Sequence, residues 1–161
     1  MGVARTHTYS IHTKWTGNDG DGTATYRSYR RDREITGPGK AEPIHGSSTP
    51  MFRGDGSRYN PEDLLVASLS ACHMLWVLHL CADAGIVVVD YQDSAEGVMR
   101  ENPDGSGEFV DVVLSPVITI TDDARVDEAE ALHERAHALC FIASSVKFPV
   151  TARPRIEVRR Y

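Results

Sequence analysis

The sequence predicts an α+β fold in a single domain that spans residues 1–161. Three observations predict this class: a long apolar helix over residues 61–84, segments typical of antiparallel hairpins before and after it, and a second helix that begins near Val126. Helices interleaved with antiparallel hairpins favour α+β over a doubly wound parallel sheet. A chain of 161 residues is also long enough to bury roughly 68–70% of its unfolded surface, which agrees with one compact core.

The first helix has clear start and stop signals. Asn60 is a favourable N-cap, and Pro61 is preset for the first helical position. Glu62 and Asp63 place negative charge against the positive end of the helix dipole. Gly85 supplies the residue at which the helix is expected to end. The sequence therefore fixes this element at both ends.

The same helix is apolar on more than one face, which predicts that it is buried on most sides. Its apolar positions are Leu64, Leu65, Val66, Leu69, Leu75, Trp76, Val77, Leu78 and Leu80. Cys72 is therefore expected in or beside the core. From its neighbours alone, such a cysteine is usually a small buried hydrophobe.

The remaining elements follow from alternation and turn residues. Residues 9–15 alternate in part and predict a strand, the glycine-rich and aspartate-rich segment 17–22 predicts a turn, and residues 23–29 predict its partner strand. A loop over residues 36–59 is long for a compact domain and hints at a functional segment. Strands are expected within 86–99 and 108–121 about a turn at 102–105, and Ile156 and Val158 mark a terminal strand.

Composition narrows the function classes. The formal net charge is -6 and is spread over both halves, so a nucleic-acid partner is not expected. The amino terminus lacks the pattern of a secretory signal, and no apolar stretch of membrane-spanning length is free of His and Cys, so we expect a soluble cytoplasmic protein without a membrane partner. Three cysteines do not make a disulfide framework, and in a reducing compartment they are reactive, ligand or buried thiols.

Two alternative functions remain open from the residues. His133, His137 and Cys140 recur on one helical face. The pairs Cys72-His73 and His79-x-Cys81 offer further nitrogen and sulfur ligands, and zinc would accept such a set, although the spacing matches no firm zinc signature. Histidines near a helix carboxyl end often only interact with its dipole and solvent. The other alternative is a thiol redox sensor or a binding dimer with little turnover.

Four motifs carry a resemblance to a known family. They are Phe52-Arg53-Gly54-Asp55, Asn60-Pro61-Glu62-Asp63-Leu64-Leu65, Ser70-Ala71-Cys72-His73 and the distant Cys140. Together they resemble the OsmC/Ohr family of hydroperoxide reductases, on its OsmC-like side, along nearly the whole chain. The resemblance implies antiparallel sheets packed around a long central helix that carries a buried cysteine, in an intertwined homodimer. It also implies a cysteine-dependent peroxidase with no metal and no organic cofactor. An external dithiol or dithiol protein would reduce the oxidised enzyme.

The resemblance assigns roles to four residues. Cys72 would attack the hydroperoxide and become a sulfenic acid, and Cys140 would close a disulfide with it. Arg53 would supply the cation that favours the thiolate and the departing oxygen, and Glu62 would orient its guanidinium. Other arginines compete for this role, namely Arg58, Arg27, Arg30 and Arg31. Cys81 matches no motif and is interpreted as structural.

Two features of the sequence complicate this assignment. Relatives often follow the second cysteine with proline, whereas here Phe141 follows Cys140. Glu62 and Cys72 are ten positions apart, which is about 15 Å of rise on a straight helix. Either the helix is interrupted, or Arg53 bridges the gap, or Glu62 serves the site of a second subunit.

Overall fold

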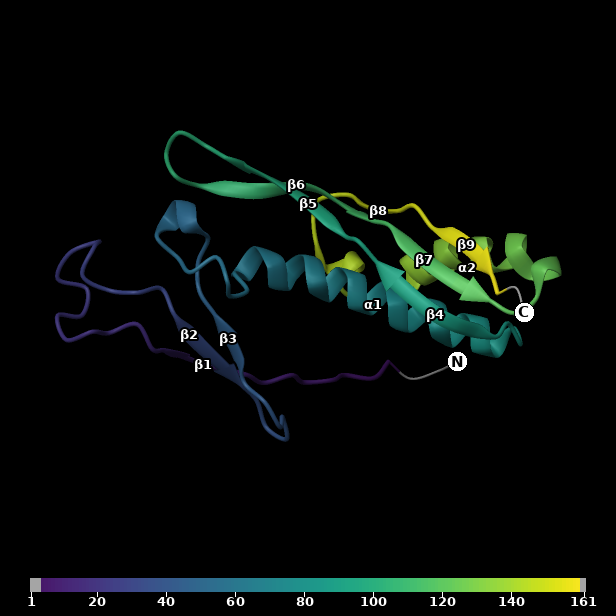
Figure 1. Cartoon of the computed structure of the whole chain (residues 1–161), viewed down its shortest axis with the longest axis horizontal. Coiled ribbons are helices and arrows are strands. Elements are labelled where there is room, and N and C mark those ends of the chain that lie inside the picture. The colour runs from purple at the N-terminus through teal and green to yellow at the C-terminus, as the bar shows by residue number, and fades with distance from the viewer. Residues whose placement is uncertain (1–3, 160–161) are drawn as a thin grey trace. The chain divides into compact units, whose positions relative to one another are not determined.

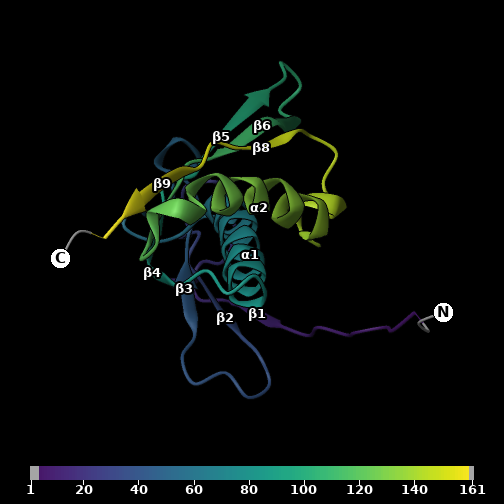
Figure 2. The same cartoon turned by 90° about the vertical axis from the view of Figure 1, so that its right-hand side faces the viewer.

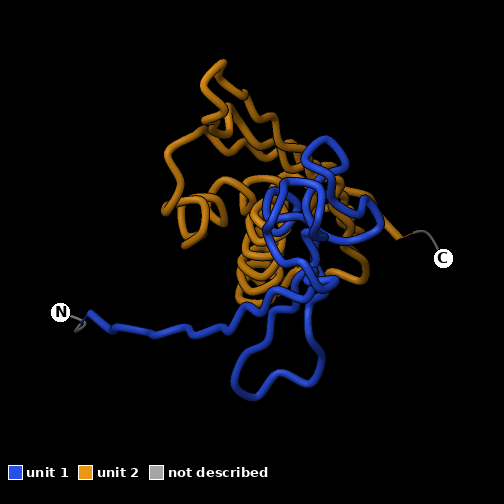
Figure 3. Tube along the Cα trace, turned by 90° about the vertical axis from the view of Figure 1, so that its left-hand side faces the viewer, with its two compact units in different colours: residues 1–64 blue, residues 65–161 orange. Residues whose placement is uncertain are grey.

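The structure of the protein is a computed structural model, and it describes residues 4–159. Contacts within the chain divide it into two compact units, residues 1–64 and residues 65–161 (Figure 3). The sequence predicts a single domain over residues 1–161. Because the contacts fall into two units, this stays a prediction.

The first unit holds a small antiparallel sheet. Its strands are β1 (His12–Trp15), β2 (Arg33–Thr36) and β3 (Ile44–Gly46), in the order β1-β2-β3 (Figure 1). The expected strand over residues 23–29 is wrong, because that segment forms turns and β1 pairs with β2 instead. The Ser28 hydroxyl donates to the carbonyl oxygens of Gly22 and Thr25, which holds the backbone in a turn. The loop expected over 36–59 contains β3 and a 3-10 turn, η1 (Pro50–Phe52).

Helix α1 (Pro61–Asp83) begins and ends where its signals predict. The Asn60 side chain accepts a hydrogen bond from the Asp63 backbone N–H at 2.7 Å, and the Asp63 carboxylate accepts one from the Asn60 N–H at 3.1 Å. This reciprocal cap satisfies two amide donors that would otherwise lack partners. Gly85 adopts φ +71°, the left-handed conformation that ends helices and that glycine adopts without steric cost.

The second unit contains two three-stranded sheets. One has the order β4-β7-β9, with strands β4 (Val88–Asp93), β7 (Pro116–Ile120) and β9 (Arg155–Val158). The other has the order β5-β6-β8, with strands β5 (Glu96–Glu101), β6 (Gly107–Leu114) and β8 (Val150–Ala152) (Figure 1). The β4–β7 and β5–β6 pairs are antiparallel, and parallel pairs with β9 and β8 extend them. The α+β prediction is confirmed, with mixed rather than purely antiparallel sheets.

The two segments expected as a hairpin each divide between the two sheets. Ser115 separates β6 from β7, and its backbone N–H donates to the Asp93 carboxylate at 2.7 Å instead of to a neighbouring strand. Pro116 follows and has no N–H to offer a ladder. The chain therefore leaves one sheet and enters the other at this point.

Helix α2 (Val126–Leu139) packs with α1 in the core of the second unit (Figure 2). It follows a 3-10 turn, η2 (Asp123–Arg125), and precedes another, η3 (Ala143–Ser145). One buried cluster joins α1, α2 and β7 and consists of Val77, Leu80, Cys81, Ile86, Ile118, Ile120, Ala129 and Ala136. A second joins α1 to β6 and consists of Leu69, Val112 and Leu114. These clusters bury one side of α1, although only 28% of its most apolar window is buried in the single chain, so the expectation of burial on most sides is not met there.

By length and composition alone, α1 is apolar enough to cross a membrane, with a mean hydropathy of 1.8 over its most apolar window. Core helices of soluble proteins meet the same criterion. Here Ser70 and His73 form hydrogen bonds to side chains of β4 and α2. These contacts fix one side of α1 to the second unit, and 28% of the window is buried.

Candidate functional site

Cys72 and Cys140 lie together in the second unit. Burial, and after it a hydrogen-bonding interaction with Cys72, raise the pKa of the Cys140 thiol to about 11. Cys72 is half-buried, Cys140 is buried, and both are free thiols. At neutral pH Cys140 therefore keeps its proton, while Cys72 is the more accessible sulfur of the pair.

Cys140 sits at the end of α2, where the helix gives way to a turn. Its backbone N–H donates to the His137 carbonyl at 3.2 Å, and its sulfur accepts from the Ala143 N–H at 3.4 Å. The Ser144 N–H donates to the Cys140 carbonyl at 3.0 Å. The turn that relatives often begin with proline thus forms here without it, and it holds the sulfur among backbone donors.

The segment of α1 around Cys72 is fixed by two polar contacts. The Ser70 hydroxyl donates to Asp93 at the end of β4, and that carboxylate also accepts the Ser115 N–H. His73, the residue after Cys72, bonds through Nε2 to Nδ1 of His133 on α2 at 3.0 Å. These contacts hold α1 to a sheet and to α2 next to the thiol.

The two histidines are buried and neutral at ordinary pH. Each has about 1% of its surface exposed. Burial, and after it the neighbouring His73, lower the pKa of His133 to about 4. Burial also lowers the pKa of His73, although the Asp93 carboxylate opposes this shift. The other ring nitrogen of each histidine, Nδ1 of His73 and Nε2 of His133, is buried and has no hydrogen-bond partner among the described residues.

The three helix residues of the zinc alternative do not gather at one site. His133 bonds to His73 and, together with His137, lines a cavity of about 390 Å³ beside Glu130 and Glu134, whereas Cys140 interacts with Cys72. Among residues 4–159, no group of three or more His, Cys, Asp or Glu side chains is placed to hold a metal ion.

Arg53 lies in the first unit and has an unusual backbone. It follows η1 with φ 63°, and it is the non-glycine residue with positive φ in the described part of the chain. Its N–H donates to the Pro50 carbonyl at 3.0 Å, and the Gly54 N–H donates to the Thr49 carbonyl at 2.9 Å. A Cβ on Gly54 would lie 1.7 Å from the Ser48 carbonyl oxygen, so only glycine fits after Arg53.

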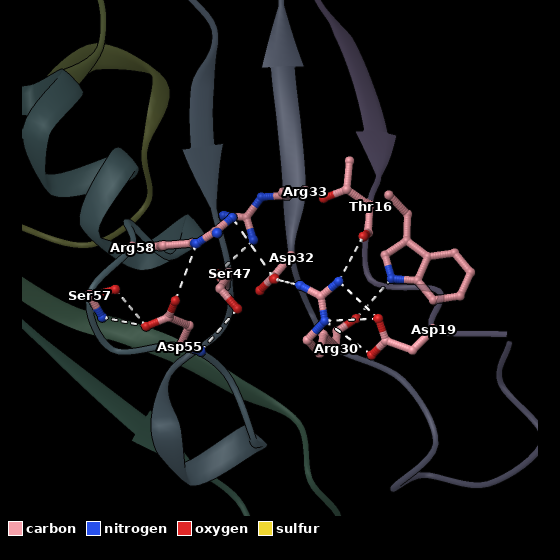
Figure 4. Close-up of polar contacts among 10 residues, drawn as sticks. Thr16, Asp19, Arg30, Asp32, Arg33, Ser47, Asp55, Ser57 and Arg58 are labelled. Atoms are coloured by element: carbon pink, nitrogen blue, oxygen red, sulfur yellow. Dashed lines mark hydrogen bonds and ion pairs between the residues drawn. The ribbon is translucent and has the colours of Figure 1, made fainter. Parts of the chain in front are cut away.

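A polar network ties the loop that carries Arg53 to the sheet of its unit (Figure 4). The buried Asp32 carboxylate pairs with Arg30 and, at 3.9 Å, with Arg58. Arg58 in turn pairs with Asp55 at 3.2 Å, and the Asp55 N–H donates to the hydroxyl of Ser47 at 3.0 Å. The loop is therefore anchored on both sides of Arg53.

Three of the four rival arginines, Arg30, Arg31 and Arg58, are occupied by these and similar contacts, whereas the Arg27 side chain is exposed and has no ion-pair partner within residues 4–64. Arg30 also pairs with Asp19 at 3.0 Å. Arg31 lies over the rings of Tyr26 and Tyr29, 4.3 and 4.1 Å from their centroids. Arg53 is exposed, and within residues 4–64 its guanidinium has no ion-pair partner, so the structure does not pair it with Glu62.

Glu62 lies in the first turn of α1, and Cys72 lies on the same uninterrupted helix. An interruption is therefore excluded as the way to bring them together. With about 15 Å of rise between the two positions, either Arg53 spans the gap or Glu62 serves another subunit.

Cys81 is separate from the thiol pair. It is fully buried in the cluster between α1, α2 and β7, and burial raises its pKa, followed by the charge of Glu128. Its surroundings match those of a structural cysteine.

Sequence reasoning missed the contacts that surround Cys72. The histidines were weighed only as metal ligands or as part of a motif, Ser70 appeared only within that motif, and Asp93 was not singled out. The signal was present for the histidines, since each falls in helical register with apolar residues on the buried face of its helix, where a polar ring needs a partner.

With this geometry in view, comparison with known proteins gives a consistent result. The family model described as OsmC-like protein matches residues 54–154. The chain belongs to the OsmC-like protein family. An OsmC-like protein of unknown function from Vibrio cholerae is similar to it, with 29% identity, coverage of 93% of this chain and 100% of that chain, and a TM-score of 0.83.

The fold is also shared at lower sequence identity. An organic hydroperoxide resistance protein from Legionella pneumophila has 19% identity and a TM-score of 0.68, with 96% of this chain and 99% of that chain covered. In sequence, the chain is also similar to the uncharacterized protein YmaD of Bacillus subtilis, with 20% identity over 144 residues, which cover 88% of this chain and 87% of that protein.

Proposed function

We propose that this OsmC-like protein is a thiol-dependent peroxidase that reduces organic hydroperoxides to alcohols. Cys72 is the attacking thiolate, and Cys140 is the resolving thiol. The observation that carries the proposal is the contact between these two sulfurs, which come from the middle of α1 and the end of α2, while Cys81 lies apart. Similarity to an organic hydroperoxide resistance protein supports the same chemistry.

The reaction balances with an external dithiol as reductant. The Cys72 thiolate attacks the outer oxygen of ROOH, the O–O bond breaks, and the departing alkoxide takes a proton to become ROH. Cys140 attacks the resulting sulfenic acid, and its proton leaves with the hydroxyl group as water while the S–S bond forms. The dithiol then supplies two electrons and two protons, which restores both thiols.

The two thiols suit different steps. A resolving thiol need not be ionised before the sulfenic acid forms, and the raised pKa of Cys140 keeps it protonated until then. Its proton is then available to the departing hydroxyl group. The half-buried Cys72 is the sulfur that a small substrate reaches more readily.

Arg53 and Glu62 complete the proposed site. A non-glycine residue held at positive φ is strained, and such strain is concentrated at functional positions. An exposed guanidinium without an ion-pair partner in its own unit remains available to a thiolate and a developing alkoxide. Glu62 would orient that guanidinium, from the same chain or from a second subunit.

A second copy of the chain is the proposed partner. Leu75 on α1 and Phe141 after α2 are exposed over 62% and 69% of their surfaces, and only 28% of the most apolar window of α1 is buried. Exposed apolar surface of this kind marks an interaction site. We therefore expect a homodimer in the cytoplasm, with no nucleic-acid or membrane partner and no cofactor.

Multiple-turnover consumption of an alkyl hydroperoxide with excess dithiol tests the function. The parent protein should consume many equivalents, and Cys72→Ser should consume none above the dithiol background. Cys81→Ser is the matched control and should remain active. A parent protein that forms the disulfide but turns over fewer than a few equivalents would support a redox sensor instead.

A further inference from the structure

The hydrogen bond between His73 and His133 has no part in the chemistry described above. Both rings are buried, and the bond joins residues that are far apart in the sequence. Among side-chain hydrogen bonds between described residues, it is the one that links α1 directly to α2. A directional polar contact in an otherwise apolar core invites a specific explanation.

The bond joins the two helices that carry the two thiols. His73 directly follows Cys72 on α1, and Cys140 lies two turns beyond His133 at the end of α2. The other fully buried residues of α2 are Ala129 and Ala136, and the partly buried Val126, Leu132 and Leu139 pack around them. These apolar contacts are not directional, whereas the histidine bond has a defined geometry.

Disulfide closure depends on the relative position of these helices. The two sulfurs must come to about 2.05 Å with their Cα atoms within about 4.4–6.8 Å, and larger separations require backbone movement. A hydrogen bond of 3.0 Å tolerates a slip of only a few tenths of an ångström before it weakens. The histidine bond therefore restrains the relative position of α1 and α2, on which disulfide closure depends.

We propose that His73 and His133 are positioning residues that align α1 with α2 so that Cys140 captures the Cys72 sulfenic acid. This inference rests on the proposed function and assigns the pair to its second step. Neither ring touches the substrate. The first step, attack of Cys72 on the hydroperoxide, does not use the alignment and should be largely independent of it.

The geometry of the bond provides matched variants. His133 uses Nδ1, whose position an asparagine amide reproduces, and His73 uses Nε2, whose position a glutamine amide reproduces. His133→Asn and His73→Gln should therefore keep the contact. His133→Gln and His73→Asn place the same amide group at the wrong distance from the backbone and should lose the contact. Replacing both rings by leucine removes the bond without leaving one buried nitrogen unpaired.

Two rates are measured for each variant in single-turnover experiments with cumene hydroperoxide. Sulfenic acid formation is measured in a Cys140→Ser background by trapping with a sulfenic-acid reagent. Disulfide closure is measured with both thiols present, by quenching and mass spectrometry. Circular dichroism and thermal unfolding confirm that each variant is folded, and His79→Leu, at an exposed histidine of the same helix, is the control.

The expected result is a split between the two steps. His133→Leu, His73→Leu and the double leucine variant should close the disulfide at least tenfold more slowly, and the double variant should be no slower than either single variant, since all three lack the same bond. His133→Asn and His73→Gln should close within about threefold of the parent. Sulfenic acid formation should stay within threefold throughout.

Two outcomes overturn the inference and are distinct from failure of the proposed function. A folded double leucine variant that closes at the parent rate shows that the pair does not align the thiols. Equal closure rates for His133→Asn and His133→Gln show the same. If the parent itself forms no sulfenic acid at Cys72, the proposed function fails, whatever the histidines do.

Discussion

The Trp76 ring, one turn of α1 beyond Cys72, meets the Phe141 ring edge to face with 5.9 Å between the ring centroids. Phe141 directly follows Cys140, so the two aromatic residues accompany the two thiols on their respective segments. Edge-to-face pairs of this kind are stabilising beyond the area they bury. They give the thiol pair an apolar flank, which a hydrocarbon group can contact and a water-like substrate cannot.

This flank predicts a preference for organic substrates. Each methylene group that leaves water contributes about 0.8 kcal/mol at most, so even partial burial of a cumyl group predicts a preference of about tenfold or more. Stopped-flow measurement should give cumene hydroperoxide a higher second-order rate constant than hydrogen peroxide. Trp76→Ala should reduce the ratio of the two rate constants, mainly by lowering the rate constant for cumene hydroperoxide. A higher rate constant for hydrogen peroxide in the parent would contradict the preference.

The contact between Cys72 and Cys140 predicts a specific disulfide. One equivalent of hydroperoxide should join these two cysteines within one chain and leave Cys81 as a free thiol, because Cys81 is fully buried in another cluster. Peptide mapping of the oxidised protein checks this directly. Cys140→Ser should form the sulfenic acid and then stall or overoxidise. Finding Cys81 in the dominant disulfide would refute the assignment.

Local signals in the sequence predicted the bounds of the first helix correctly, but they did not predict how the strands pair into sheets. The cap at Asn60 and the stop at Gly85 depend on neighbouring residues, and both are confirmed. The strand expected at 23–29 failed because the turn hydrogen bonds of Ser28 compete with strand pairing. The division of two long segments between two sheets was missed, since it depends on the bond between Ser115 and the distant Asp93.

The candidate site shows the same distinction. Cys72 and Cys140 were found through motifs, and the structure places them together. The His73–His133 bond was not foreseen, because no pattern within one helix reveals which residue of another helix its buried ring will contact. Long-range pairs of this kind follow from tertiary packing rather than from spacing.

Arg53 should matter for the first chemical step. Arg53→Ala removes the cation proposed to stabilise the thiolate and the departing alkoxide, so sulfenic acid formation should slow by about 10- to 1000-fold. Arg53→Lys should recover only part of the rate, because an ammonium group cannot hold two partners in one planar fork. Arg5→Ala, at an exposed arginine of the same unit that does not compete for this role, is the control. If Arg53→Ala reacts as fast as the parent, Arg53 is not the cation of the site, and Arg58 is the next residue to test.

The exposed apolar surface should be covered in a dimer. Leu75→Glu places a charge on a residue that is 62% exposed in the single chain, so it should cost the monomer little and the dimer much. Light scattering at micromolar concentration should show a dimer for the parent and a shift toward monomer for the variant. Asp83→Ala, also exposed on α1, should leave the dimer intact. A parent protein that is monomeric would refute the proposed assembly.

Acid should destabilise the fold through the buried histidine pair. The pKa of His133 is lowered to about 4, chiefly by burial, and that of His73 is lowered as well, with Asp93 opposing and His137 adding to the shift. Below the unfolded pKa of about 6.5, the unfolded chain binds protons that the folded chain does not, so stability falls as pH falls. The pair's stabilisation is thus complete above about pH 6.5 and is lost progressively toward pH 4. The free energy of unfolding, measured with urea, should fall by roughly 1 to 3 kcal/mol across this window. Replacing both rings by leucine should flatten the slope between pH 6.5 and 5, where few carboxylates titrate, and His79→Leu should not. An unchanged slope in the double leucine variant would show that other groups bind these protons.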